Sequence, residues 1–306
     1  MMKAPALCAF LCAGLLFPCA AAQEDDAARD AEECRAEAEK GDAWAQCQMG
    51  VRYGQGRGVP KDEARAAEWF RKAAVQGNSL AQFNLGILYD NGAGVEKDAA
   101  KAAEWYTKAA ELGDDDAQFN LANMYLEGRG VKQDTAQAVK WLSRAASLNN
   151  ASAMCSLGIL CAEGQGVEKN DAKAVYWFLL AAQLGNINAC YNLGVMYENA
   201  RGVEWDGAKA AALYRKAAEL GHAEARLNLG VMYVNGSGVE KDAAKAAYWF
   251  GKAAEQGNAD AQYNLGSMYD HGEGVEKDAA KAVDLYRKAA QQGCTEAAQR
   301  LKELGE

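Results

Sequence analysis

The sequence predicts an all-α protein, a right-handed α-solenoid of stacked antiparallel helix pairs, on three observations. A motif recurs at a fixed interval of 36 residues, and its apolar residues follow the period of an amphipathic helix. The chain contains no proline after Pro60, as long helical stretches require. The repeat must also explain how a helical chain accommodates 31 glycines, because glycine weakens helix interiors.

The N-terminal residues 1–22 have the features of a secretory signal peptide. Lys3 precedes an apolar stretch, and the segment closes on three alanines that end at Ala22. We therefore expect cleavage after Ala22 and export to the periplasm or out of the cell. No later stretch is apolar enough to cross a membrane, so we expect no membrane insertion after cleavage.

Seven full repeats are expected between residues 42 and 293, with a capping helix on each side in residues 23–41 and 294–306. The pair Leu85-Gly86 marks the register and recurs with substitutions in every repeat. The repeats are 42–77, 78–113, 114–149, 150–185, 186–221, 222–257 and 258–293. A single helix pair cannot bury its apolar surface, whereas stacked pairs can.

Each repeat reads as a first helix, a glycine-containing loop and a second helix. In 78–113 the first helix carries Ala81, Leu85 and Tyr89 on one face, and the second helix stops at Gly113. An aspartate or asparagine stands where the second helix needs an N-cap, at Asp62, Asp98, Asp134, Asn170, Asp206, Asp242 and Asp278. A further column is expected in the core rather than in a binding groove: Leu88, Met124, Leu160, Met196, Met232 and Met268. Most of the glycines stand in the loops that end helices, which explains how a helical chain accommodates them. The glycines at the position of Gly86 lie within first helices, where they allow close contact between helices.

The pattern A-x-A-x-x-x-L-G-x-x-Y, then G-x-G-V, then D-x-x-K-A-x-x-W-Y-x-K-A-A-x-x-G resembles the Sel1-like repeat and is almost intact in residues 223–257. A tetratricopeptide array is the nearest alternative, but it has a shorter loop and a 34-residue period. The resemblance implies a scaffold for protein–protein interaction. Stacking of the helix pairs predicts that the concave side of the solenoid is formed mainly by first helices. Three departures put local packing in question: Ala122 for the paired glycine, Cys161 for the tyrosine and Ala200 for the first loop glycine.

An amide column on the first helices is the main candidate for ligand binding. It matches a position that forms an asparagine ladder in tetratricopeptide arrays, and an amide can donate and accept at once, which suits peptide groups. An aromatic column runs beside it. The predicted peptide-binding residues are Asn84, Asn120, Asn192, Asn228, Asn264, Phe83, Phe119, Tyr191 and Tyr263. The alternative is that the amides only set repeat stacking and the aromatics only pack the core.

The acidic balance, 42 Asp and Glu against 33 Lys and Arg, disfavours binding to nucleic acid or an anionic membrane surface. Carboxylates at the predicted groove rim would steer a basic protein or peptide partner toward it, although solvated surface charge is the default explanation. These rim residues are Asp90, Glu127, Glu163, Glu198 and Asp270. We expect a monomer.

Six cysteines remain after signal cleavage, in a compartment where disulfides persist. Cys34 and Cys47 lie almost symmetrically about the turn at Lys40-Gly41, which predicts a disulfide between them. The resemblance implies a bridge between cysteines eight apart in cysteine-rich relatives, but Ala182 stands where Cys190 would need its partner. The pairing of Cys155, Cys161, Cys190 and Cys294 stays open.

Catalytic chemistry finds little support. The two histidines, His222 and His271, form no H-E-x-x-H motif, and the chain has no S-x-x-K, S-D-N or K-T-G. We therefore expect no enzyme activity, catalytic residue, metal site or cofactor. The second hypothesis is a β-lactam-binding or β-lactamase-like envelope protein, because the resemblance extends to cysteine-rich relatives described in that way.

Overall fold

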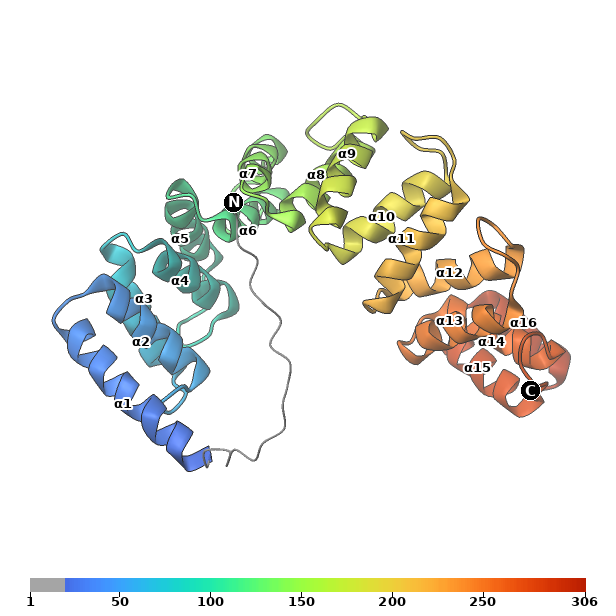
Figure 1. Cartoon of the computed structure of the whole chain (residues 1–306), viewed down its shortest axis with the longest axis horizontal. Coiled ribbons are helices and arrows are strands. Elements are labelled where there is room, and N and C mark those ends of the chain that lie inside the picture. The colour runs from blue at the N-terminus through green and yellow to red at the C-terminus, as the bar shows by residue number, and fades with distance from the viewer. Residues whose placement is uncertain (1–19) are drawn as a thin grey trace, which may run out of the picture. The chain divides into compact units, whose positions relative to one another are not determined.

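The computed structural model describes the backbone of residues 20–306 and the side chains from residue 27 onward. These residues form sixteen helices and no strand (Figure 1). The described part of the chain divides into two compact units, the first ending at Leu112 and the second beginning at Gly113. The first unit contains α1 (Ala20–Glu39), α2 (Ala43–Gln55), α3 (Glu63–Val75), α4 (Ser79–Asn91) and α5 (Ala99–Glu111). The second contains α6 (Asp115–Glu127), α7 (Thr135–Ser147), α8 (Ala151–Glu163), α9 (Asp171–Gln183), α10 (Ile187–Glu198), α11 (Gly207–Glu219), α12 (Ala223–Asn235), α13 (Ala243–Glu255), α14 (Ala259–His271), α15 (Ala279–Gln291) and α16 (Thr295–Leu304).

Within each unit the helices pair in tandem, as the sequence predicts. Even-numbered helices from α2 to α14 are the first helices of the seven repeats, and the odd-numbered helices that follow them are the second helices. By the 36-residue register, α1 corresponds to a second helix and α16 to a first helix. The predicted all-α class of tandem helix pairs is therefore confirmed. Most of the predicted signal segment, residues 1–19, lies outside the described residues.

The predicted N-caps of the second helices are confirmed. In each case the side-chain oxygen accepts a hydrogen bond from the backbone amide three residues later, at 3.0 Å between Asp98 Oδ1 and the nitrogen of Lys101. The same bond is present at Asp62, Asp134, Asn170, Asp206, Asp242 and Asp278. In all seven repeats, the second helix therefore begins directly after an Asp or Asn that caps it.

The loop glycines end the first helices and let the loops approach the preceding repeat. Gly92 adopts a left-handed conformation with φ of 75° at the end of α4. A Cβ atom on Gly94 would collide with the backbone of Glu63, at the start of α3. The fifth repeat departs as the sequence indicates: α10 ends one residue early, and Ala200 takes a left-handed φ of 51°.

In six of the seven repeats, the core is built on a glycine of the first helix that faces an aromatic ring of the second helix. A Cβ atom on Gly50 would lie 2.6 Å from ring atoms of Phe70, which is 4% exposed. The same pairing joins Gly86 to Tyr106, Gly158 to Phe178, Gly194 to Tyr214, Gly230 to Phe250 and Gly266 to Tyr286. The third repeat has Ala122 and Leu142 at these two positions, both fully buried. In the third repeat, the larger Ala122 in the first helix is thus accompanied by a leucine, Leu142, in place of the aromatic ring of the second helix.

The methionine and leucine column of the first helices belongs largely to the core, as predicted. Its members are buried from the third repeat onward, at Met124, Leu160, Met196, Met232 and Met268, whereas Leu88 is half-buried.

Candidate functional site

The second unit has an open hollow on its first helices, and it brings together three of the predicted peptide-binding residues. This central hollow has a volume of about 280 Å³. Phe119 from α6 and Tyr191 and Asn192 from α10 line it, with α8 between them. The remaining lining residues are Ser152, Cys155, Ser156, Ile159, Asn186, Asn188 and His222.

The central hollow exists because α8 carries small residues where its neighbours carry large ones. Cys155 stands in the aromatic column, and Ser156 stands in the amide column. Both line the hollow between Phe119 and Tyr191. The loss of one ring and one amide leaves space for side chains of another molecule.

Aromatic and amide groups wall this space. The Tyr191 ring stacks on the His222 imidazole, with centroids 4.5 Å apart and planes 19° from parallel. It also lies 5.8 Å from the ring of Tyr214 on α11, so one ring serves both core and surface. The Asn192 amide nitrogen lies 4.0 Å from Cys155 Sγ, a weak contact that leaves its carbonyl oxygen available.

His222 is the N-cap of α12, a position that Asn or Asp holds in the other repeats. Its Nδ1 accepts a hydrogen bond from the amide of Ala225 at 3.3 Å, so the imidazole needs an unprotonated Nδ1. Burial lowers the pKa of His222, and the nearby carboxylate of Glu224 opposes this effect only partly. The ring that forms one wall of the hollow is therefore held in its neutral form.

Burial suppresses the acidity of the other groups in the central hollow. It raises the pKa of the Cys155 thiol to about 11, so this sulfur is protonated at neutral pH and is a poor nucleophile. Burial, with a smaller effect from Glu224, also raises the pKa of the Tyr191 hydroxyl. The hollow offers neutral hydrogen-bonding groups and flat apolar surface.

A second hollow continues this surface toward the C-terminus. This C-terminal hollow has a volume of about 370 Å³, and three predicted residues, Asn228, Tyr263 and Asn264, line it. The other lining residues are Leu227, Val231, Asp260, Cys294 and Glu296. Asn228 lies close enough to the Tyr191 hydroxyl to lower its pKa slightly against the effect of burial, so the two hollows adjoin at these two residues. We call the surface formed by both hollows the first-helix face.

The remaining predicted residues are not in either hollow. Asn84 donates to the carbonyl oxygen of Leu80 in its own helix at 2.7 Å, which favours the structural interpretation there. The ring of Phe83 lies 5.9 Å from that of Tyr106, a core contact within its repeat. Asn120 is half-buried on α6 and does not line the central hollow, although Phe119 beside it does.

The predicted acidic rim is only partly present. Asp270 is 8% exposed and forms an ion pair with Arg300 of α16 at 2.7 Å, so its expected place on an open rim is wrong. Glu198 accepts a hydrogen bond from the Tyr214 hydroxyl at 2.6 Å. These two carboxylates join neighbouring helices. The carboxylates that line the C-terminal hollow are instead Asp260 and Glu296.

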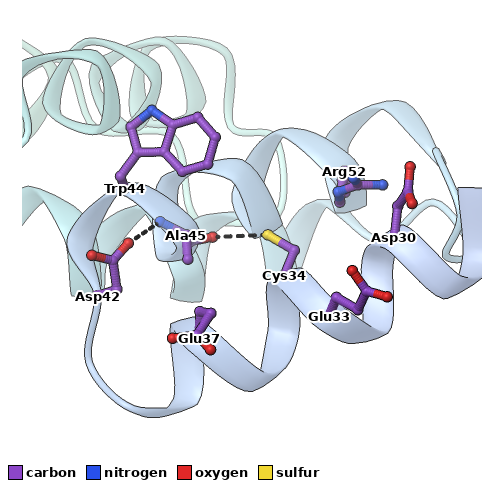
Figure 2. A pocket seen from close by; sticks show the side chains of 8 residues that line it. All are labelled: Asp30, Glu33, Cys34, Glu37, Asp42, Trp44, Ala45 and Arg52. Atoms are coloured by element: carbon purple, nitrogen blue, oxygen red, sulfur yellow. Dashed lines mark hydrogen bonds between the residues drawn. The ribbon is translucent and has the colours of Figure 1, made fainter.

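The first unit has a hollow of about 560 Å³ between α1 and α2 (Figure 2). Cys34 lines it, and its Sγ lies 3.5 Å from the carbonyl oxygen of Ala45. The predicted disulfide is not formed in the structure, where Cys34 and the buried Cys47 are both free thiols. The pairing stays a prediction that chemical mapping can test.

Sequence reasoning missed Cys155, His222 and Ser152 as parts of the site. The signal for the first two is a break in a repeat column, since Cys155 replaces an aromatic residue and His222 replaces an Asn or Asp cap. Ser152 occupies an ordinary exposed helix position that no pattern marks.

Among the described residues, no group of three or more His, Cys, Asp or Glu side chains could hold a metal ion. None of the described helices combines the length and the apolar character that a membrane span needs.

The chain belongs to the Sel1 repeat family. The family model matches seven times in succession, over residues 45–78, 79–114, 115–150, 151–186, 187–222, 223–258 and 259–294. Proteins built from Sel1 and related repeats are generally protein-interaction scaffolds. No curated protein matched the chain in the sequence comparison.

Two solved structures are similar over most of the chain. One is a protective antigen present in uropathogenic Escherichia coli strains, with 42% identity and a TM-score of 0.85 over 90% of this chain. The chain spans 59% of the length of that antigen. The other is a Sel1 repeat protein from Oxalobacter formigenes, with 36% identity, a TM-score of 0.75, and coverage of 92% of this chain and 81% of that protein.

Proposed function

We propose that this protein is an exported scaffold that binds an extended peptide segment of another protein along the first-helix face. The observation that carries the proposal is the meeting of amide and aromatic columns in two adjoining open hollows. Peptide backbone presents donors and acceptors at regular intervals, and amide side chains match both kinds of group.

The dimensions and chemistry of the hollows support a peptide rather than a compact small molecule. Each hollow is open and modest in volume, at about 280 and 370 Å³, which suits one or two side chains of an extended chain. Tyr191 and Tyr263 offer flat apolar surface, and Asn192, Asn228 and Asn264 lie beside them. Asp260 and Glu296 favour basic residues in the segment at the C-terminal hollow.

The first experiment places a photo-crosslinking amino acid at Ile159, which lines the central hollow and is 37% exposed. The control position is Leu148, which is 49% exposed and lines neither hollow. Crosslinked partners from envelope and secreted fractions are identified by mass spectrometry. We expect one partner to be trapped from Ile159 and not from Leu148, and equal trapping from both positions would contradict the proposal.

The second experiment measures the affinity of that partner for two variants. Asn192, Asn228 and Asn264 are replaced together by Ala, and Cys155→Phe restores the aromatic ring that other repeats carry and fills the central hollow. The matched control replaces the exposed Asn199 and Asn235 by Ala. Both site variants should weaken binding at least about tenfold, a loss typical of central interface contacts, while the control does not. If the triple variant folds and binds the partner with unchanged affinity, the proposal that the partner binds along the first-helix face is refuted.

Export is tested separately. The signal-like segment and the expected cleavage after Ala22 predict a mature protein that begins at Gln23. N-terminal sequencing of the protein from the envelope and culture medium checks this. An uncleaved chain confined to the cytoplasm would contradict export without bearing on the first-helix face.

A further inference from the structure

Three pairs of neighbouring helices, α1 and α2, α3 and α4, and α11 and α12, share an arginine–tyrosine contact. The arginine Nη2 donates to a tyrosine hydroxyl eighteen residues later, at 2.9 to 3.0 Å. The pairs are Arg35 with Tyr53, Arg71 with Tyr89, and Arg215 with Tyr233. In each pair the guanidinium extends from one helix across the tyrosine of the next.

Burial of these tyrosines follows the presence of the arginine. Tyr53, Tyr89 and Tyr233 are 4%, 9% and 6% exposed. The tyrosines at the same position without an arginine partner, such as Tyr197 and Tyr269, are only half-buried. The arginine side chain therefore covers a surface that stays partly open in its absence.

The sixth repeat has glycine in place of this arginine, and a hollow takes its place. Gly251 of α13 lies eighteen residues before Tyr269 of α14. The two residues line a hollow of about 370 Å³. No group among the described residues forms a hydrogen bond with the Tyr269 hydroxyl. The other lining residues are Ala244, Ala247, Tyr248, Lys252, Glu255, Leu265 and Val275.

Charges around this hollow match those around the arginines of the other repeats. The Lys281 ammonium lies 5.2 Å from the Tyr269 ring centre, as Lys245 lies 5.5 Å from that of Tyr233 beside Arg215. Lys252 corresponds to Lys216, the neighbour of Arg215. Lys252 pairs with Glu255 at 3.3 Å, whereas Lys216 donates to the carbonyl oxygen of Ala182. The chain thus already holds a guanidinium next to a tyrosine whose ring has the equivalent lysine beside it.

We propose that the hollow between α13 and α14 receives an arginine side chain from a partner protein. The guanidinium would donate to the Tyr269 hydroxyl, as Arg215 does to Tyr233, and its planar face would contact the ring of Tyr248, which is 57% exposed. Leu265 and Val275 supply apolar walls for the methylene groups. This site uses residues of α14 other than those of the first-helix face, so it stands or falls independently of the peptide groove.

A repeat without the arginine can carry another large side chain at that position. Leu179 of α9, in the fourth repeat, stands at the arginine position before Tyr197 and is 36% exposed. Gly251 carries no side chain there. A Cβ atom there would meet only Leu265 Cδ2 at 4.0 Å, so the backbone leaves room for a side chain.

The test uses the full chain and N-acetyl-arginine amide as the probe, with N-acetyl-lysine amide as the matched cation. NMR of labelled Leu and Val methyl groups follows Leu265 and Val275. We expect their resonances to shift on titration with the arginine probe, with a dissociation constant at least about fivefold lower than for the lysine probe. Tyr269→Phe should weaken the arginine probe about tenfold by removing one hydrogen bond to a charged donor.

Gly251→Arg is the decisive variant because it supplies the side chain that the other repeats contain. It should abolish the response to the probe, whereas Gly251→Ala, which leaves most of the space, should retain it. No response in the native chain, equal response to both probes, or an unchanged response in Gly251→Arg would overturn the proposal. A concentration-dependent dimer that Gly251→Arg disrupts would assign the arginine to a second copy of this chain and overturn its assignment to another protein.

Discussion

The packing of glycine against an aromatic ring makes a sharp prediction in α2, where two glycines lie one turn apart. A Cβ atom on Gly50 would lie 2.6 Å from two ring carbons of Phe70 and 2.8 Å from Cγ. A Cβ atom on Gly54 would meet only the Cβ of Ala66, at 3.9 Å. The substitutions Gly50→Ala and Gly54→Ala are therefore chemically identical but face different surroundings.

The expected magnitudes follow from two opposing effects. Alanine in a helix interior is favoured over glycine by about 0.5 to 1 kcal/mol. Overpacking a core costs about 1 to 3 kcal/mol, and Gly50→Ala should lie near the upper end because Phe70 is only 4% exposed and Cγ cannot swing away. We expect Gly50→Ala to destabilise the first unit by about 2 kcal/mol and Gly54→Ala to stabilise it by about 0.5 to 1 kcal/mol.

Hydrogen exchange measured by mass spectrometry localises the effect without assuming that the whole chain unfolds at once. Exchange of the amides in α2 and α3 should be about thirtyfold faster in Gly50→Ala, the equivalent of about 2 kcal/mol, and about two- to fivefold slower in Gly54→Ala. Exchange in the second unit serves as the internal reference.

A double variant tests the physical cause. The third repeat carries Ala122 with Leu142, so Gly50→Ala combined with Phe70→Leu reproduces a pair that this chain already uses. The two changes should be less destabilising together than their sum by about 2 kcal/mol. The reasoning is refuted if Gly50→Ala and Gly54→Ala have the same effect, or if the two changes in the double variant are additive.

Three further predictions concern hydrogen bonds and ionisation. Gln82 Oε1 is buried and accepts no hydrogen bond from the described residues, whereas the equivalent oxygen of Gln46, one repeat earlier, accepts one from Gln76 at 2.8 Å. Leu112 stands where Gln76 stands in that repeat, so Leu112→Gln should stabilise the first unit by about 1 kcal/mol in urea unfolding. No gain in stability would contradict this prediction. Burial lowers the pKa of His222 in the folded chain, so the contribution of the neutral imidazole to stability should be complete above about pH 6.5 and should be lost as the pH falls through the pKa of the folded state. His222→Asn should make the urea midpoint less dependent on pH below about pH 6.5. The same pH profile in the variant and the native chain would argue against this prediction. Hydrogen bonds from backbone amides lower the pKa of four N-cap aspartates in the folded chain. Their contribution to helix stability should therefore be present above about pH 4 and should be lost as the pH falls through their folded-state pKa values. Amide exchange should then become faster at the starts of α5, α11, α13 and α15, and faster exchange only in other parts of the chain would count against the prediction. These aspartates are Asp98, Asp206, Asp242 and Asp278.

Local structure was predictable because its causes are local. The apolar period, the N-cap column and the loop glycines fix helix starts and ends from contacts within a few residues, as Asp98 shows by capping Lys101. Even the strain at Ala200 is visible in the sequence as a broken glycine column. The family also follows from the sequence, because the register repeats without insertion.

The candidate site was only partly predictable, because a hollow depends on volumes contributed by several helices. The amide and aromatic columns correctly indicate a surface, but the columns alone do not show which members are open. Asn84 turns back to its own helix, whereas Asn192 and Asn228 lie in hollows. Asp270 looks like a rim carboxylate in sequence, yet Arg300, thirty residues away, buries it.

The all-α repeat architecture, its register and the caps of its helices follow from the amino-acid sequence, since each of these depends on neighbours along the chain. Where the surface is open depends instead on how side chains from different helices pack. Cys155 and Gly251 are small residues like many others in this chain, and they create hollows because residues from adjacent helices surround them. Packing between helices is a property of the assembled side chains, and for that reason the hollows form at positions that break the repeat.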